Sequence, residues 1–415
     1  MMYEGSLSDL GTIKQKGFLY SEKYGDKVIG LHNKRDYFFE LNFLLDSLLD
    51  FNRCGENISL EYLKGKVTSF LIDCFFTKTD ERHKCINKFY EDLKKELRDN
   101  LVEYTVPLLI ENLSFDSEMF VGDVKFVDYS PENRKKLLEN SPIESHIPDI
   151  YQPEPKNIEK TLDRMKQVKS IGITKVTSID FYKALEEASE KVEEALNVVR
   201  LFNINSYFGI FGGYNRPIFH EVIAINAKTG FVSSSTGWDG DIIECKFSAD
   251  ELKGDAKKAF ENICAILKKG KESREEMENK LLIAINIFGD IQKSIEIQHN
   301  ISKMFTALET LLVFNRFENK GDNIAERAVL INHISKEERI EKHELINKMY
   351  NCRNDLVHSG STDFKRLQYD YLLVELLLCI LNIAKHIDKY PKQENWEKII
   401  KDAKDIVFET KLIFQ

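Results

Sequence analysis

Proline is scarce in this sequence, with only eight among 415 residues. Half of them lie in one stretch, at Pro142, Pro148, Pro153 and Pro155. Because proline cannot propagate a helix or a central strand, this stretch is the best candidate for a linker between domains. A chain of this length accommodates two or three domains of about 100–200 residues. We therefore predict a domain boundary near residue 155.

Cysteine is also scarce, and its pattern excludes two kinds of site. The seven cysteines are odd in number and include no Cys-x-x-Cys pair. A disulfide framework needs paired cysteines, and a zinc knuckle needs closely spaced ones. We expect reduced thiols, as in a cytoplasm. The sequence also has no cluster of His, Cys and Asp with ligand spacing near the motif described below, so we expect no metal and no cofactor.

An excess of positive charge and a long apolar run are both missing. Lysine and arginine number 59 against 68 aspartates and glutamates, which gives a net charge of −9. That balance argues against a histone-like binder of nucleic acid but allows an enzyme that contacts a few nucleotides. The longest apolar run, residues 371–381, contains Glu375 and is shorter than the ~20 residues that span a bilayer. The first residues lack the apolar segment of a signal peptide. We expect a cytoplasmic protein with no membrane partner.

The pattern of apolar residues predicts an α+β protein of several domains, with mixed α/β regions followed by a C-terminal all-α helical bundle. We predict a mixed domain over 1–155, a middle part over 156–270 with a helix and a small β-element, and the bundle over 271–415. Spacings of three and four indicate helices, and β-branched residues between glycines indicate strands. The expected helices cover 81–101, 178–202, 280–314, 323–334, 336–358, 363–388 and 395–408, and Ser130 caps a shorter one. The expected strands are two segments around a turn within 103–130 and an antiparallel element within 205–247.

One segment, residues 348–360, carries side chains suited to chemistry: Lys-Met-Tyr-Asn-Cys-Arg-Asn-Asp-Leu-Val-His-Ser-Gly. One helical stripe through it is formed by Ile346, Tyr350, Arg353 and Val357. An arginine on such an inward-facing stripe needs an anion or a carboxylate, because an unpaired buried charge is very costly. A structural ion pair of Arg353 with Asp355 or Glu309 is the alternative to a role in binding a ligand.

His358 lies one turn beyond Arg353, directly before Ser359 and Gly360, where a helix is expected to end. Histidine can accept or release a proton near neutral pH, and arginine can hold a phosphate with its planar fork. Together they suit metal-free cleavage of RNA by the ribose 2′-hydroxyl. Positions five apart are about 140° apart around an ideal helix, so we expect two such helices to meet about a two-fold axis. A helix C-terminal cap is the structural alternative for His358.

The segment resembles the HEPN superfamily of small helical bundles, whose ribonuclease motif is an arginine, four to six residues and a histidine. Arg353 and His358 match that motif, and the polar Asn354 follows the arginine. The upstream segments that match the Apea-like HEPN branch in order and spacing are Phe-Thr-Ala-Leu-Glu-Thr-Leu-Leu (305–312) and Ala-Glu-Arg-Ala-Val-Leu-Ile (325–331). The resemblance covers roughly residues 275–390. It implies that Arg353 and His358 are catalytic and that Asn354 and Asp355 support them.

The resemblance also implies a function and partners. The expected activity is that of a metal-independent endoribonuclease that cleaves RNA as a homodimer or higher homo-oligomer, like anti-phage abortive-infection or toxin effectors. The parts before the bundle would respond to a phage-derived or cellular trigger. The alternative is a non-catalytic HEPN module that binds a nucleotide or scaffolds a partner protein. Gly360 replaces the tyrosine of members paired with a nucleotidyltransferase antitoxin, so AMPylation there is not expected. Glu309 and Arg327 are expected to form a structural ion pair.

Overall fold

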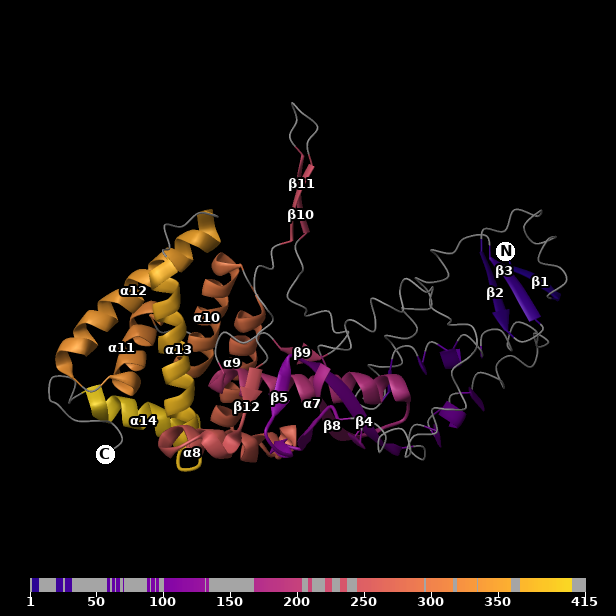
Figure 1. Cartoon of the computed structure of the whole chain (residues 1–415), viewed down its shortest axis with the longest axis horizontal. Coiled ribbons are helices and arrows are strands. Elements are labelled where there is room, and N and C mark those ends of the chain that lie inside the picture. Colours follow the sequence, from indigo (N-terminus) through magenta and orange to yellow (C-terminus); the bar gives the residue numbers. More distant parts are fainter. Residues whose placement is uncertain are drawn as a thin grey trace. The chain divides into compact units, whose positions relative to one another are not determined.

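The computed structural model shows a mixed α/β protein, with strands and sheets in the first part of the chain and helices in the last (Figure 1). This coarse class agrees with the sequence-based prediction. The chain divides into two compact units, Met1–Val106 with Lys175–Ser189, and Pro107–Thr174 with Glu190–Gln415. The structure describes residues 2–6, 20–24, 27–31, 58–59, 62–63, 65–67, 70, 88–89, 91–93, 95–96, 101–130, 132–133, 168–203, 208–210, 221–225, 232–236, 245–294, 296–315, 319–333, 335–359 and 366–404. The predicted boundary at residue 155 lies outside them, and the one at residue 270 stays a prediction.

The first unit contains a three-stranded antiparallel sheet with the order β1-β3-β2. Its strands are β1 (Met2–Ser6), β2 (Tyr20–Tyr24) and β3 (Lys27–Leu31). In the same unit Asp180 caps α7 (Phe181–Phe202), the predicted helix 178–202, by accepting a hydrogen bond from the Lys183 amide at 3.0 Å. Its carboxylate also accepts bonds from the amide and the hydroxyl of Ser59, both at 2.8 Å. Asp180 therefore ties the first turn of α7 to a segment far upstream in the sequence.

A five-stranded sheet has the order β6-β7-β8-β4-β9. Its strands are β4 (Val102–Glu111), β6 (Met119–Val121), β7 (Val124–Asp128), β8 (Val168–Ser178) and β9 (Gly209–Ile210). The two segments predicted as strands around a turn within 103–130 do form strands, but β4 and β7 do not pair with each other, because β8 lies between them. The sequence pattern does not reveal β8. Its buried side chains include Ser170, Thr174 and Ser178, which break the alternation of apolar and polar residues.

The tight turn between β6 and β7 requires a glycine. Gly122 has a φ of +59°, and an added Cβ would lie 2.6 Å from the Cβ of Leu267. Close after β7, the amide of Asn133 donates a hydrogen bond to the Ser130 hydroxyl at 3.2 Å. The predicted helix cap at Ser130 is therefore confirmed.

The predicted antiparallel element within 205–247 is confirmed for one hairpin, formed by β10 (Glu221–Ile225) and β11 (Val232–Thr236). The other two strands of this segment pair elsewhere. β9 pairs with β4, and β12 (Cys245–Phe247) pairs in parallel with β5 (Leu113–Phe115). A parallel partner far away in the sequence has no local turn signal, so residue patterns cannot predict it.

From residue 254 onward the described chain is almost entirely helical. Its helices are α8 (Gly254–Leu267), α9 (Glu276–Lys293), α10 (Ile297–Leu312), α11 (Lys320–Asn332), α12 (Lys336–Ser359), α13 (Arg366–His386) and α14 (Gln393–Lys404). The predicted helices in this part are confirmed with small shifts at their ends, as far as the described residues reach. The exception is the predicted helix 280–314, which breaks into α9 and α10 where Ser294 is extended. The apolar stripe continues across the break and so conceals it.

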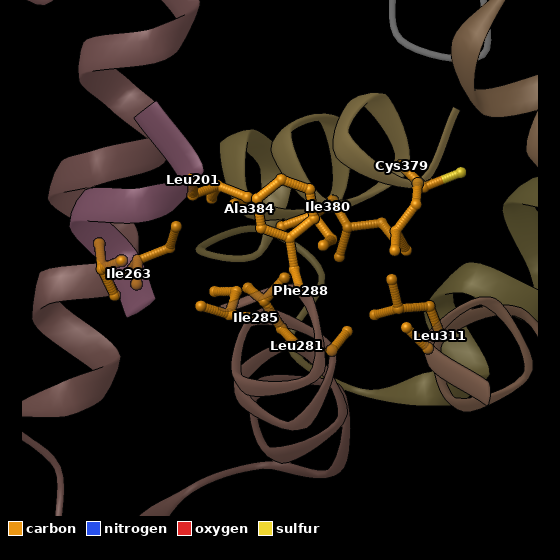
Figure 2. Packing of buried hydrophobic residues seen from close by; sticks show 14 of the residues in the cluster. Leu201, Ile263, Leu281, Ile285, Phe288, Leu311, Cys379, Ile380 and Ala384 are labelled. Atoms are coloured by element: carbon orange, nitrogen blue, oxygen red, sulfur yellow. The ribbon is translucent and has the colours of Figure 1, made fainter. Parts of the chain in front are cut away.

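α13 forms the centre of the apolar core in this part of the chain. It packs against α8, α9, α10 and α11, and the fully buried residues along it include Leu372, Leu376, Ile380 and Ile383. Figure 2 shows Ile285 and Phe288 of α9 facing Ile380 and Ala384 of α13. By length and composition alone, the helical residues 367–386, which include the apolar run 371–381, would suffice to cross a membrane. Half of that helix is buried inside the protein, which accounts for its apolar sequence.

A buried polar network joins α7 to α9. Arg200 of α7 is 1% exposed and donates to Glu193 at 2.7 Å, while Lys293 of α9 pairs with the same carboxylate at 2.8 Å. Burial alone would raise the pKa of Glu193, but the two cations outweigh it and hold that pKa below its ordinary value. The helices also approach closely at Gly289, where an added Cβ would lie 1.9 Å from the Asn197 Oδ1. Any larger residue at position 289 would push the two helices apart.

Candidate active site

The helix that carries the predicted motif, α12, runs without a break to Ser359. His358 and Ser359 both still belong to this helix, and Gly360, where the helix is predicted to stop, lies outside the described residues. α12 packs against α10 and α11, and Ile346 and Tyr350 are buried in that contact, with exposures of 0% and 9%. The stripe that contains them therefore faces the core of its own chain rather than a second subunit. Val357, at the far end of the same stripe, is 58% exposed.

Arg353 lies at the edge of this core, with 22% of its side chain exposed. Its Nη1 donates to the Asn354 Oδ1 at 3.1 Å, and its Nη2 lies 3.6 Å from the Glu309 Oε1. The guanidinium carbon stands 5.6 Å from the centre of the Tyr350 ring, within cation–π range. Its Nε is buried and makes no hydrogen bond within the part of the chain that the structure describes. The guanidinium is therefore oriented, yet most of its donors are not used.

Glu309 of α10 is the carboxylate on which this cluster converges. Its Oε1 accepts a hydrogen bond from the Tyr350 hydroxyl at 3.3 Å, and its Oε2 pairs with the Lys320 ammonium at 3.1 Å. The predicted ion pair between Glu309 and Arg327 is wrong. Arg327 instead donates to the carbonyl of Leu312, with its guanidinium 4.5 Å from the centre of the Phe314 ring. The Glu309 carboxylate thus lies between two cations, Arg353 and Lys320, and these three charged groups together carry one net positive charge.

Tyr350 is held rigidly beneath Arg353. Its ring meets Phe305 edge to face, with centroids 5.2 Å apart. On another side it touches Gly321, where an added Cβ would lie 2.7 Å from the Tyr350 Cδ1. Burial raises the pKa of the Tyr350 hydroxyl and Glu309 raises it further, against a smaller lowering by Arg353. The hydroxyl therefore stays protonated at neutral pH and donates to the carboxylate.

The other predicted site residues lie further along the same helix. His358 and Asp355 are exposed, and Asn354 is half-buried against Arg353. On a regular helix, a residue five positions on is about 7.5 Å further along the axis and about 140° around it. One chain therefore brings Arg353 and Asn354 together but aims His358 in a different direction. Sequence reasoning offered Glu309 only as a structural partner of Arg353, and it missed Lys320 altogether.

A second polar cluster in the same group of helices surrounds Glu375 of α13. This carboxylate is 2% exposed and accepts hydrogen bonds from His333 at 2.9 Å, Asn332 at 2.9 Å and Tyr371 at 2.6 Å. Burial alone would raise the pKa of Glu375, but these hydrogen bonds outweigh it and hold that pKa below its ordinary value. Burial and the nearby carboxylate raise the pKa of the Cys379 thiol, so that thiol is not a candidate nucleophile.

The remaining observations concern metals and relatives. Among the described residues, no group of three or more His, Cys, Asp and Glu side chains is placed to hold a metal ion. Comparison of the chain with protein-family models, with curated proteins and with solved structures gives no match. Any functional conclusion therefore rests on the motif and on the geometry around it.

Proposed function

We propose that this protein is a metal-independent endoribonuclease of the HEPN type, with its C-terminal helices as the HEPN bundle and with Arg353 and His358 as catalytic residues. One observation carries the proposal: Arg353 is oriented by its neighbours, partly exposed and left with unused donors. Arginine has five N–H donors, and here only one makes a hydrogen bond to a described residue. A guanidinium in that state is ready to bind a phosphate.

In the proposed reaction His358 takes the proton of a ribose 2′-hydroxyl, and the 2′-oxygen attacks the adjacent phosphorus. The bond between phosphorus and the 5′-oxygen breaks, and the protonated His358 returns its proton to the leaving oxygen. Arg353 donates hydrogen bonds to the phosphate oxygens as their negative charge increases. The products are a 2′,3′-cyclic phosphate and a 5′-hydroxyl. DNA lacks the attacking hydroxyl and is therefore not a substrate.

The site is proposed to form between two copies of the chain. Because α12 is continuous, the separation of about 140° between Arg353 and His358 is not relieved within one subunit. A two-fold axis is the commonest way for a protein to bring two copies of one surface together. The exposed Val357, next to His358, is the apolar residue that we expect at this contact. The assembly is thus a homodimer or a higher homo-oligomer.

The cellular role follows from the resemblance alone. In that reading the protein acts in the cytoplasm as an anti-phage abortive-infection or toxin effector. The parts of the chain before the bundle restrain the nuclease until a phage-derived or cellular trigger arrives. Sequencing of RNA ends after induced expression would identify the RNA sequence that is cut.

The test uses two single variants and their mixture. His358→Ala and Arg353→Ala should each abolish RNA cleavage, and His358→Ala should leave the unfolding midpoint unchanged because that side chain is exposed. When the two inactive proteins are mixed, part of the activity should return, since a mixed dimer still joins one Arg353 to one His358. Full activity of His358→Ala would contradict the nuclease assignment. Absence of recovery in demonstrated mixed dimers would contradict the shared site.

A non-catalytic module that binds a nucleotide or a partner protein is the second candidate. The ion pair between Arg353 and Glu309 favours it, because such a pair also serves as a purely structural link. The same variants discriminate the two functions. A scaffold would bind RNA or nucleotide without cleaving it, and replacing His358 would not alter that binding.

A further inference from the structure

We infer that Glu309 is a positioning residue for Arg353, and that Tyr350 and Lys320 keep its carboxylate in place. The inference rests on the proposed function and adds three residues to its site. Glu309 does not reach the reacting phosphate in this account. It acts only by fixing where the guanidinium of Arg353 points.

The contacts come from three different helices, so the arrangement depends on the packed bundle. Glu309 lies on α10, Lys320 begins α11, and Tyr350 and Arg353 lie one turn apart on α12. The two oxygens of Glu309 have different partners: Oε1 lies near the Tyr350 hydroxyl and the Arg353 guanidinium, and Oε2 pairs with the Lys320 ammonium. The Tyr350 ring lies against the guanidinium and the Glu309 carboxylate lies beside its Nη2, which leaves the guanidinium little freedom to turn.

The charges show why this contact positions Arg353 instead of neutralising it. The distance of 3.6 Å from Nη2 to the carboxylate is too long for a good hydrogen bond, so those protons remain available. Lys320 takes up the other side of the carboxylate at 3.1 Å. Without Lys320, Glu309 and Arg353 would form a one-to-one pair of opposite charges that competes with a phosphate. With it, a net positive charge remains at a position that is only partly buried.

The first experiment measures kcat and KM for RNA cleavage by Glu309→Ala, Glu309→Gln and Tyr350→Phe. A misplaced guanidinium should lower the kcat of Glu309→Ala by about 10- to 100-fold. Glu309→Gln should recover part of that loss, because its amide oxygen still accepts from Tyr350 and Arg353. Tyr350→Phe should lose least. Tyr371→Phe is the matched control, since it removes a hydroxyl bonded to the buried Glu375 carboxylate and should leave kcat unchanged.

A second measurement reports on Arg353 without reference to RNA. Phenylglyoxal modifies arginine side chains, and peptide mass spectrometry gives the rate at Arg353. Glu309→Ala should raise that rate, and Tyr371→Phe should not. Unchanged kcat together with an unchanged labelling rate in folded Glu309→Ala would overturn the inference, while inactive His358→Ala would still support the nuclease. If the wild type cleaves no RNA, the proposed function fails, and the labelling rate alone decides whether Glu309 holds Arg353.

Discussion

Two glutamates in the same set of helices, one buried and one partly exposed, have different surroundings. Glu375 is 2% exposed and receives hydrogen bonds from an amide, a hydroxyl and an imidazole, which all belong to the protein interior. Glu309 is 19% exposed and receives two cations and a hydroxyl. The first carboxylate is saturated by its partners. The second leaves the cations around it only partly neutralised and open to solvent.

The difference separates a stabilising network from a candidate site. A buried polar network with every member bonded makes the core rigid and leaves nothing for a ligand to bind. The cluster around Glu309 is partly exposed, has a surplus of positive charge and keeps an unused guanidinium donor. Such a cluster can bind an anion, because the anion would supply the missing negative charge and hydrogen-bond acceptor. On this comparison, changes at Glu375 should affect stability alone, and changes around Glu309 should affect cleavage as well.

The largest effect on stability is expected from Glu375→Ala. It leaves the half-buried donors of Asn332, His333 and Tyr371 without their acceptor, which should lower the free energy of unfolding by about 2–4 kcal/mol. Urea unfolding measures that loss. Cleavage per folded molecule should not change.

Glu344→Gln, an exposed position on α12, is the control and should change the free energy of unfolding by less than about 0.5 kcal/mol. A drop in kcat for folded Glu375→Ala would show that the two clusters are coupled, and would remove the distinction drawn between them.

Two glycines lie where helices approach closely, and only one of them contacts the cluster around Glu309. Gly321→Ala forces a methyl group against the Tyr350 ring, and Gly289→Ala forces one against Asn197. Overpacking should lower the free energy of unfolding by about 1–3 kcal/mol in both. Only Gly321→Ala displaces the ring beneath Arg353, so only this variant should also lower kcat, by about 10-fold. Equal kcat values for the two folded variants would argue against a positioning role for Tyr350.

The smallest effect concerns pH. The pKa of Glu375 is lower in the folded protein than its ordinary value, so its ionised form adds stability above about pH 4.3, and that stability is lost as the pH falls through the lower folded value. Glu375→Gln should therefore be less stable than the wild type by about 1–2 kcal/mol at pH 7. The gap should close as the pH falls below about 4. A gap that stays constant in urea titrations from pH 7 to pH 3 would contradict the network.

Helices could be predicted from the sequence where one apolar face repeats over several turns, as in α12 and α13. The predictions fail where partners are far apart in the chain or where polar residues are buried. β8 buries Ser170 and Thr174, with the Ser170 hydroxyl bonded to the carbonyl of Leu113, and β12 joins a strand far upstream. A pattern within one segment contains no information on such pairings.

In the candidate site, too, the local pattern could be predicted from the sequence and the contacts between distant segments could not. The stripe on α12 predicted an inward-facing Arg353 with an anion or a carboxylate as its partner, and in the structure Arg353 lies at the edge of the core beside the Glu309 carboxylate. Which carboxylate it meets depends on how α10, α11 and α12 are packed, and no spacing in the sequence gives that. Glu309 already stood out in the segment 305–312. Lys320 carried no signal, because a lone lysine at the start of a helix is ordinary.

The chemistry of the cleaved ends tests the central claim most directly. Purified wild-type protein is incubated with RNA and with DNA of the same sequence in EDTA, and the product ends are identified. We predict cut RNA with 2′,3′-cyclic phosphate and 5′-hydroxyl ends, intact DNA, and no cut RNA from His358→Ala. Uncut RNA, loss of cleavage on chelation, or products with 5′-phosphate ends would contradict this prediction.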